Sequence, residues 1–399
     1  MPAGPVPALL GGNPAVDRSR WPSWPPRLPG LFEALKKVVE DDQWGVRSET
    51  IQRFEQDFAR YHDAQYGLAM ANGTVALYAA LAALGVKGGD EVIVPAYTFM
   101  ACAAAVMHTG ATPVFADIDP HTFNLDPQDA ARRISPRTAA IMPVHIGGNP
   151  ADMGAFQTLA REHGLGLVED AAQAHGAGYN GTRVGALGDV GCFSFQSSKN
   201  MTAGEGGILL TNDQGIYERA FEVYNCGRTL SGPWYEHVVP GLNFRISAFQ
   251  AAILQHQMSY LDDWADTRET NGRYLEERLN AIEGITCAQR YPGTTRNAYH
   301  LLIFTYDSRH FHGLPKAHFL EALNAEGVVA TEGYRPVYRL AFMEQSAGRQ
   351  EELPVTERIC RDGIWIRQFE LLGNRSLMDG IAEAILKIQA HAERLKARP

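Results

Sequence analysis

The alternation of short apolar runs with helix-length segments constrains the fold of this chain more than any other feature. Apolar runs typical of strands stand at residues 91–99, 112–118, 139–148 and 165–172. Helical segments lie between them at 101–110, 129–134 and 153–164. Strands that alternate with helices of about ten residues favour an α/β fold with a mostly parallel sheet. The runs contain few polar residues, which suits strands covered by helices on both faces.

The two ends of the chain differ from this middle part. Residues 1–30 are rich in proline and glycine, so we expect an irregular arm rather than a helix or central strand. From about residue 245 to 282 the periodicity predicts one long helix, straight or bent. Because 399 residues exceed the usual size of one domain, we predict three parts. These are an N-terminal arm with a large domain (1–250), a connecting helix (251–284) and a small C-terminal α/β domain (285–399).

Composition excludes several classes of protein. Acidic residues number 45 against 36 basic ones, a net charge of −9, which argues against a nucleic-acid partner. No apolar run approaches the ~18 residues that would cross a bilayer, and the N-terminus lacks the pattern of a secretory signal. The five cysteines are scattered, without a CxxC pair. We therefore expect a cytoplasmic protein with neither a disulfide framework nor a metal site.

The segment CFSFQSSKNMTAGEGGILLTND (192–213) is the most informative in the chain. Its Lys199 follows an apolar strand, precedes a glycine-rich turn and has uncharged neighbours. Partial desolvation would lower the pKa of such a lysine and make it an amine nucleophile that can hold a carbonyl cofactor. A surface lysine in a loop fits this segment equally well.

A carboxylate and an aromatic ring follow two other predicted strands. Asp170 ends a buried run, at the sheet edge where α/β proteins bind ligands. It could hold a protonated ring nitrogen, or it could cap the next helix. Gln173 could face the same site. Tyr97 follows the run at 91–95 and could stack on a cofactor ring or belong to the core.

A candidate phosphate site comes from the segment ANGTVAL (71–77). Gly73 and Thr74 open a helix, where free backbone N–H groups favour an anion. The alternative is an ordinary helix cap. Ser194, five residues before Lys199, could add a hydroxyl or be a strand serine. An amine, an acid, a stacking ring and a phosphate cradle are together the parts that pyridoxal phosphate requires.

The order and spacing of these parts resemble the DegT/DnrJ/EryC1/StrS aminotransferases, pyridoxal-phosphate enzymes of fold type I. The resemblance covers nearly the whole chain from about residue 10. The motifs that carry it are NGTVAL, VPAYTF, EDAAQAHGA, FSFQSSKNMTAGEGG, GLNFRISAFQAAI and GYRPVYR. One departure is Ala248, where the family often has an acidic residue. Dehydratase relatives replace the cofactor lysine with histidine, so Lys199 favours amino transfer.

The resemblance implies a role for each candidate residue. Lys199 would form the Schiff base with the cofactor and then move a proton. Asp170 would hold the pyridine nitrogen, Gln173 would lie near the ring oxygen and Tyr97 would stack on the ring. The phosphate would contact Gly73, Thr74 and Ser194, together with Asn243 of a neighbouring subunit. The active sites would then be shared within a homodimer.

The resemblance also implies a ping-pong transamination from L-glutamine or L-glutamate to a keto substrate. The motifs are most similar to the branch that aminates keto-cyclitols such as scyllo-inosose. Acceptor contacts are expected from the side chains Trp44, His145, Arg245, Tyr334 and Arg335. Alternative functions are a nucleotide-sugar aminotransferase and a dehydratase or aromatising synthase of the 3-amino-5-hydroxybenzoate type. A more distant one is a non-enzymatic pyridoxal-phosphate-binding regulator.

Overall fold

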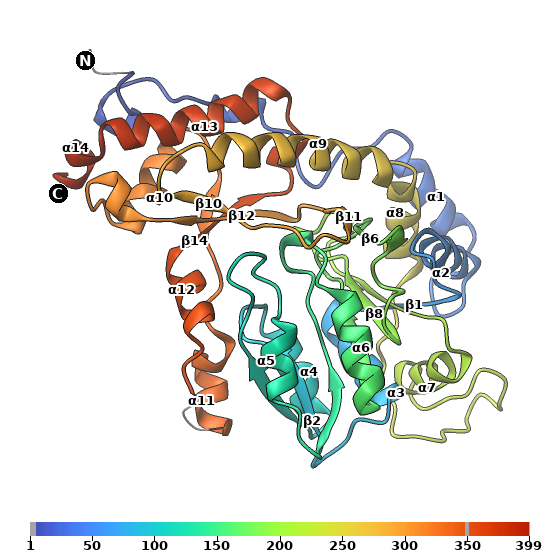
Figure 1. Cartoon of the computed structure of the whole chain (residues 1–399). Helices are drawn as coiled ribbons and strands as arrows, with labels where there is room; N and C mark the ends of the chain where they lie inside the picture. Colours follow the sequence, from blue (N-terminus) through green and yellow to red (C-terminus); the bar gives the residue numbers. More distant parts are fainter. Residues whose placement is uncertain (1–4, 348–350, 399) are drawn as a thin grey trace.

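The computed structural model describes residues 5–347 and 351–398 (Figure 1). Its centre is a seven-stranded sheet in the order β1-β9-β8-β5-β4-β2-β3. These strands are β1 Tyr66–Met70, β2 Glu91–Pro95, β3 Thr112–Ala116, β4 Thr138–Ile141, β5 Gly166–Asp170, β8 Val190–Ser194 and β9 Gly207–Thr211. Neighbouring strands from β8 to β3 are parallel. Strand β9 is antiparallel to both of its neighbours, β8 and β1, so β1 runs in the same direction as the parallel strands. The predicted α/β fold with a mostly parallel sheet is confirmed.

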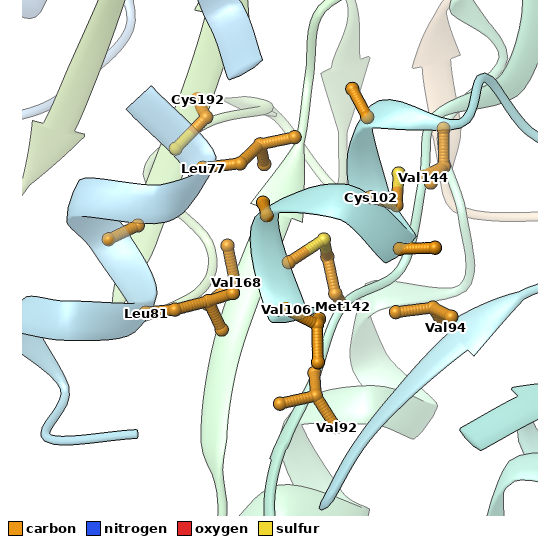
Figure 2. Packing of buried hydrophobic residues seen from close by; sticks show 14 of the residues in the cluster. Leu77, Leu81, Val92, Val94, Cys102, Val106, Met142, Val144, Val168 and Cys192 are labelled. Atoms are coloured by element: carbon orange, nitrogen blue, oxygen red, sulfur yellow. The ribbon is translucent and has the colours of Figure 1, made fainter. Parts of the chain in front are cut away.

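Helices cover both faces of this sheet, as the apolar strands require. The helices of this part are α1 Leu31–Glu40, α2 Glu49–Tyr61, α3 Gly73–Ala83, α4 Ala101–His108, α5 Pro127–Arg132, α6 Met153–His163 and α7 Gln214–Tyr224. Successive strand residues point to opposite faces. Val92 and Val94 therefore pack under α3, α4 and α7, whereas Ile93 packs with α2 and α6. Figure 2 shows the first of these layers, with Leu77 of α3 and Val106 of α4 near the strand valines.

A second, antiparallel sheet lies in the C-terminal part, in the order β10-β12-β14-β13. Its strands are β10 Ile285–Cys287, β12 Leu301–Tyr306, β13 Ala330–Glu332 and β14 Gly363–Arg367, and a small three-stranded sheet joins β6 Gly178–Tyr179, β7 Thr182–Arg183 and β11 Thr294–Arg296. The helices here are α10 Lys316–Ala325, α11 Ala341–Ala347, α12 Pro354–Asp362, α13 Arg375–Ala390 and α14 Ala392–Lys396. Alternate residues of β14 again separate: Ile364 and Ile366 pack with α13, whereas Trp365 packs with the first sheet's core. One face of β14 is therefore turned toward the large sheet.

The segment predicted as one long helix from 245 to 282, straight or bent, is helical but changes direction at a break. The chain forms α8 Ala248–Met258 and then α9 Leu261–Asn280, with Ser259 and Tyr260 between them. The two helices pack on different partners, because α8 contacts α1 and α2 whereas α9 runs beside α13 (Figure 1). The apolar face of α8 is buried against α1 and α2, whereas that of α9 is buried against α13. The chain therefore changes direction between the two helices.

The N-terminal arm is irregular, as expected, with short 3-10 turns at Ala8–Leu10 and Arg18–Arg20. It packs on the C-terminal part rather than on the large sheet. The carboxylate of Glu326 accepts hydrogen bonds from the backbone N–H groups of Ala8 and Ala15 at 2.7 and 2.8 Å. The Lys387 ammonium donates to the Asn13 carbonyl and pairs with Glu326. Among the described residues, no helix is both long and apolar enough to cross a membrane.

Candidate active site

A cavity of about 920 Å³ lies at the carboxyl ends of the parallel strands. The ends of β5 and β8 supply Asp170 and Ser194, and the loop after β2 supplies Thr98 and Phe99. The opposite wall comes from β13, from β14 with the residues after it, and from Trp24 in the arm. The site therefore lies between the two sheets, at the edge where open α/β sheets bind ligands.

Lys199 lines this cavity and is half-buried. The loop that holds it is fixed on both sides of the lysine. The Asn200 amide donates to the Ala298 carbonyl at 2.6 Å, and the Thr202 hydroxyl donates to the Phe195 carbonyl at 2.9 Å. Burial lowers the pKa of Lys199 to about 8, although the negative charge of Asp170 opposes the shift. A larger share of this amine is consequently neutral near pH 8 than for an exposed lysine.

Asp170, buried at the end of β5, is held by two donors. Its Oδ1 accepts from the Ala172 N–H at 3.0 Å, and its Oδ2 accepts from the Cys102 thiol at 3.0 Å. Cys102 lies on α4, one turn after Thr98, whose hydroxyl is 3.5 Å from the sulfur. Burial and the adjacent carboxylate raise the pKa of the Cys102 thiol well above its usual value. The thiol therefore remains protonated and acts as a hydrogen-bond donor.

The N-terminus of α3 faces the same cavity. The Asn72 side chain caps the helix by accepting from the Val75 N–H at 3.0 Å. Gly73 lies against Ser194, since a Cβ added at Gly73 would come within 2.8 Å of the serine Cβ. Only a glycine lets the helix start so close to β8. With Thr74, these residues form a cradle of backbone N–H groups and hydroxyls suited to an anion.

Gln173 and Tyr334 line the cavity, as predicted, and a hydrogen bond joins their side chains. The Gln173 Oε1 accepts from the Gly147 N–H at 2.7 Å, and its Nε2 donates to the Tyr334 hydroxyl at 2.9 Å. Both side chains line the cavity. The pair thus joins the loop after β5 to the C-terminal wall.

The structure places Tyr97, the expected stacking ring, outside the lining of the cavity. Its side chain is fully buried beneath the cavity, and its hydroxyl accepts from Trp365 Nε1 at 2.9 Å. Phe99, two residues on, lines the cavity with 54% of its surface exposed. Tyr97 was expected in the cavity because it directly follows the strand, but the chain turns there and presents the later ring.

His145 also lies outside the cavity, in a buried structural network. Its Nδ1 accepts from the Ala151 N–H at 3.0 Å, so its Nε2 donates to Glu169, also at 3.0 Å. The same carboxylate accepts from the Gly185 and Leu187 N–H groups. With both ring nitrogens bonded and no exposed surface, His145 has no free group for a substrate.

Four further expected site residues are outside the lining of the cavity. Trp44 is half-exposed and donates to the Val38 carbonyl, and Arg335 is exposed. The Arg245 guanidinium donates to Asn225 and Cys226. Asn243 is exposed on the same surface loop. Within one chain, these side chains do not reach the cavity.

Sequence analysis missed Phe99, Cys102, His300, Arg367 and Gln368, all of which belong to the site or directly support it. Phe99 stands in the motif VPAYTF, two residues after Tyr97, so the motif itself carries two candidate rings. Cys102 carries no signal among five scattered cysteines. The others come from the second sheet, whose approach to the first depends on tertiary packing.

Taken together, the site contains a partly neutral amine, a fixed carboxylate, an exposed aromatic ring and an anion cradle. A neutral amine can add to an aldehyde and can later accept or return a proton. The carboxylate can hold a cationic ring nitrogen, and the cradle can hold a phosphate. This combination suits a phosphorylated carbonyl cofactor.

Comparisons with known proteins give a consistent result. Residues 30–385 match the DegT/DnrJ/EryC1/StrS aminotransferase family. The chain is 36% identical over 421 residues to the L-glutamine:2-deoxy-scyllo-inosose aminotransferase of Streptoalloteichus tenebrarius, covering 98% of this chain and 99% of the relative. It is 35% identical over 385 residues to the 3-amino-5-hydroxybenzoate synthase of Amycolatopsis mediterranei, covering 93% and 98%. A crystal structure of 3-amino-5-hydroxybenzoic acid synthase superposes with a TM-score of 0.87 at 34% identity, covering 94% and 98%.

Proposed function

Because this chain belongs to the DegT/DnrJ/EryC1/StrS aminotransferase family, we propose that it transfers an amino group from L-glutamine or L-glutamate to a keto-cyclitol. The observation that carries this proposal is the half-buried Lys199 amine in a cavity with Asp170, with its pKa lowered to about 8. Amino transfer needs a lysine that can be neutral, and this site provides one.

The family implies pyridoxal phosphate as the cofactor, and the residues of the cavity fit it. Gly73, Thr74 and Ser194 are suited to the phosphate, Asp170 to the ring nitrogen, and Lys199 to the aldehyde. The exposed ring of Phe99 replaces Tyr97 as the proposed stacking partner. When bound, the cofactor supplies a conjugated ring that stabilises negative charge at the carbon whose proton is removed.

Lys199 acts as the base of the reaction in this proposal. It takes the proton from the carbon that bears the amino group and returns it at the cofactor's carbonyl carbon, which is the transfer that amino exchange requires. Asp170 lowers the fraction of neutral lysine, since its charge favours the ammonium form. Burial exceeds this effect and sets the net direction. The fixed loop keeps the amine within the cavity throughout.

Asp170 is the group that would keep the ring nitrogen protonated. Its two donors, the Ala172 N–H and the Cys102 thiol, hold its plane and leave further lone pairs for the ring. We propose that Cys102 positions Asp170 rather than reacting itself.

The acceptor side favours a keto-cyclitol over a nucleotide-linked sugar. Among the described residues that line the cavity, Arg367 is the one permanently cationic side chain. A nucleotide diphosphate would call for more basic groups. The wall instead offers neutral polar groups from Gln196, Ser197 and Thr331, which suit the hydroxyls of a cyclitol. The relative at 36% identity is named for such an acceptor.

We propose that two copies of the chain complete the site. The loop that carries Asn243 exposes large apolar side chains, with Trp234 54% and Tyr235 85% exposed. Apolar surface of this kind commonly marks an interface. In the proposed homodimer, Asn243 of one subunit reaches the phosphate site of the other, as the family resemblance implies.

Absorption spectroscopy and product analysis test this function. The purified protein with pyridoxal phosphate should show a visible band that Lys199→Ala abolishes. L-glutamine or L-glutamate should bleach the band, and a keto-inositol should restore it with formation of an amine. A panel of keto-inositols and nucleotide-linked keto-sugars identifies the acceptor. Turnover of the nucleotide-linked sugars alone would overturn the cyclitol proposal.

The second candidate is an aromatising synthase of the 3-amino-5-hydroxybenzoate type, favoured by the 35% identity and the TM-score of 0.87 to such proteins. The two functions differ in their product. Loss of water and appearance of aromatic ultraviolet absorption would support the synthase, whereas gain of an amine without dehydration supports amino transfer.

A further inference from the structure

Arg367 is a cation in the cavity wall without an anionic partner. It is the last residue of β14, its side chain is exposed, and it lines the cavity. Within the described ranges, 5–347 and 351–398, its guanidinium forms no ion pair and no hydrogen bond. A guanidinium presents a planar fork of N–H donors that matches a carboxylate. An unpaired one beside a reactive site is therefore a candidate anchor for an acidic ligand.

The buried carboxylate nearest in the chain, Glu370, interacts with the charge of Arg367 but forms no ion pair with its guanidinium in the described residues. Its two oxygens accept from the backbone N–H groups of Val329 and of Arg367 itself, at 2.8 and 3.2 Å. Burial also raises the pKa of Glu370 to about 7. The guanidinium consequently keeps its charge for a ligand.

Two side chains in the same wall as Arg367, Gln368 and Trp24, have N–H groups without a hydrogen-bond acceptor in the described part of the chain. The guanidinium of Arg268, fully buried on α9, donates to the side-chain oxygen of Gln368 at 3.0 Å. This hydrogen bond orients the Gln368 side-chain amide, so its oxygen is bonded and its Nε2 is left without an acceptor from the residues that the structure describes. Among the described residues, neither Gln368 Nε2 nor Trp24 Nε1 has an acceptor. Both residues line the cavity, and Gln368 is 1% exposed. This wall therefore offers a charge and N–H groups to a ligand rich in oxygen acceptors.

This wall lies beside the reactive amine. In the sheet register Arg367 pairs with Leu301, and the Gln368 N–H donates to the His300 carbonyl at 3.1 Å. His300 in turn contacts Asn200, the residue after Lys199, at 3.2 Å. Burial, together with the positive charges of Lys199 and Arg367, lowers the pKa of His300 well below its usual value. The His300 imidazole is therefore neutral and adds no charge to this wall.

We propose that Arg367, with the N–H donors of Gln368 and Trp24, binds the α-carboxylate of the amino-acid donor. This inference rests on the proposed function. The α-carboxylate is attached to the carbon that carries the transferred amine, so an amine acceptor and a carboxylate anchor must lie close together. Lys199 and Arg367 line the same cavity, and both of their charges act on His300. What Arg367 recognises is an anionic group. A phosphate on the keto acceptor is the alternative source of such a group.

Binding of an unreactive donor analogue tests the proposal. The analogue is 4-carbamoylbutanoate, which is glutamine without its α-amine and so cannot react. Titration calorimetry on the holoenzyme should show a dissociation constant about ten- to a hundredfold weaker for Arg367→Ala than for the unchanged protein. Pentanediamide, the uncharged matched ligand, should bind both proteins alike. Arg361→Ala removes an equal charge outside the cavity lining and should change nothing.

Half-reactions separate donor from acceptor. In Arg367→Ala, the L-glutamine concentration that half-bleaches the visible band should rise by about ten- to a hundredfold. The keto-acceptor concentration that restores it should change less than about threefold. Equal binding of 4-carbamoylbutanoate by both proteins, or no binding by either, overturns the proposal. A change confined to the acceptor step also overturns it and assigns the anion to the acceptor. If no amino acid bleaches the unchanged protein, the proposed function fails, and the calorimetry alone decides whether Arg367 binds carboxylates.

Discussion

At the scale of single residues, the chemistry of Lys199 is determined by what surrounds it rather than by lysine itself. The loop bonds of Asn200 and Thr202 keep the amine in the cavity, and burial lowers its pKa to about 8. The negative charge of Asp170 acts in the opposite direction. Lys199 is thus poised between its two protonation states near pH 8.

The first prediction follows from this pKa. A base must be neutral, and lysine is neutral above its pKa, so the rate of the L-glutamine half-reaction should rise as pH increases through about 8 and then level off. Stopped-flow absorbance of the saturated holoenzyme between pH 6 and pH 10 measures this profile. A rate that is flat or falls over this range would exclude Lys199 as the base.

The second prediction concerns the thiol beside Asp170. Cys102→Ala removes a donor at 3.0 Å from a buried carboxylate, which should lower kcat/KM about tenfold. Cys102→Ser retains a donor and should recover most of the loss. The pH at which the visible band titrates should move in the alanine variant and remain in the serine variant.

Cys287→Ala is the matched control, since Cys287 is buried in the C-terminal part, away from the cavity. Equal losses in the serine and alanine variants at position 102 would mean that Cys102 serves packing alone.

Local sequence was informative about the residues that follow strands. Lys199, Asp170 and Gly73 could be identified because uncharged neighbours, a strand end and a helix start are all visible in the chain. Tyr97 and Phe99 could not be told apart, since both follow the same strand and only the turn decides which ring faces the cavity. His145 has the polarity of a ligand residue, but its partners Glu169 and Ala151 are distant in sequence.

At the scale of elements, the start of α3 shows how tightly helix and strand must meet. The helix begins against the last residue of β8, with Gly73 beside Ser194. The free N–H groups of this first turn face the cavity. The approach distance of the two elements therefore determines the size of the proposed phosphate site.

The third prediction tests this approach. A Cβ at Gly73 would lie 2.8 Å from the Ser194 Cβ and 3.3 Å from the Phe193 carbonyl oxygen, so Gly73→Ala should push the helix away from the strand. The dissociation constant of pyridoxal phosphate should rise at least about tenfold, measured by titrating the apoprotein.

Gly45→Ala is its control, because a Cβ there meets no atom within 4 Å. Unchanged cofactor affinity in Gly73→Ala would remove the start of α3 from the phosphate site.

Helices and strands were predictable where they pack only within the large domain. The alternation of strands and helices from β2 to β5 gave the central sheet, because each run is covered on both faces. The break between α8 and α9 and the orientation of β14 were not predictable. Both depend on how the C-terminal part packs against the large sheet, and the local periodicity of the sequence carries no information about that packing.

At the scale of the whole molecule, the proposed reaction requires groups from both ends of the chain and, in our proposal, from a second copy. Trp24 and Arg367 form one wall, and Lys199 and Asp170 form the other. The exposed apolar residues Trp234 and Tyr235 lie near Asn243 in sequence and suit burial against another subunit.

The fourth prediction tests the shared site. Lys199→Ala and Asn243→Ala should each be nearly inactive alone. When the two are mixed by unfolding and refolding, half of the dimers carry one of each, and one site in each hybrid is intact. The mixture should regain about a quarter of the normal activity.

Sedimentation should show a dimer at the assay concentration. An active monomer, or a mixture that stays inactive, would contradict the shared site.

The arm has a consequence for how the protein is made. Its first residues dock on Glu326, 318 positions later in the chain, and on Lys387, which lies further still. A ribosome adding about 5–20 residues per second needs roughly 20–75 s to synthesise that docking surface. The segment with Trp24 also depends on later residues, since its ring packs against Trp264 and Arg268 of α9. The nascent chain can therefore finish its central sheet long before the arm has docked and the cavity wall is complete.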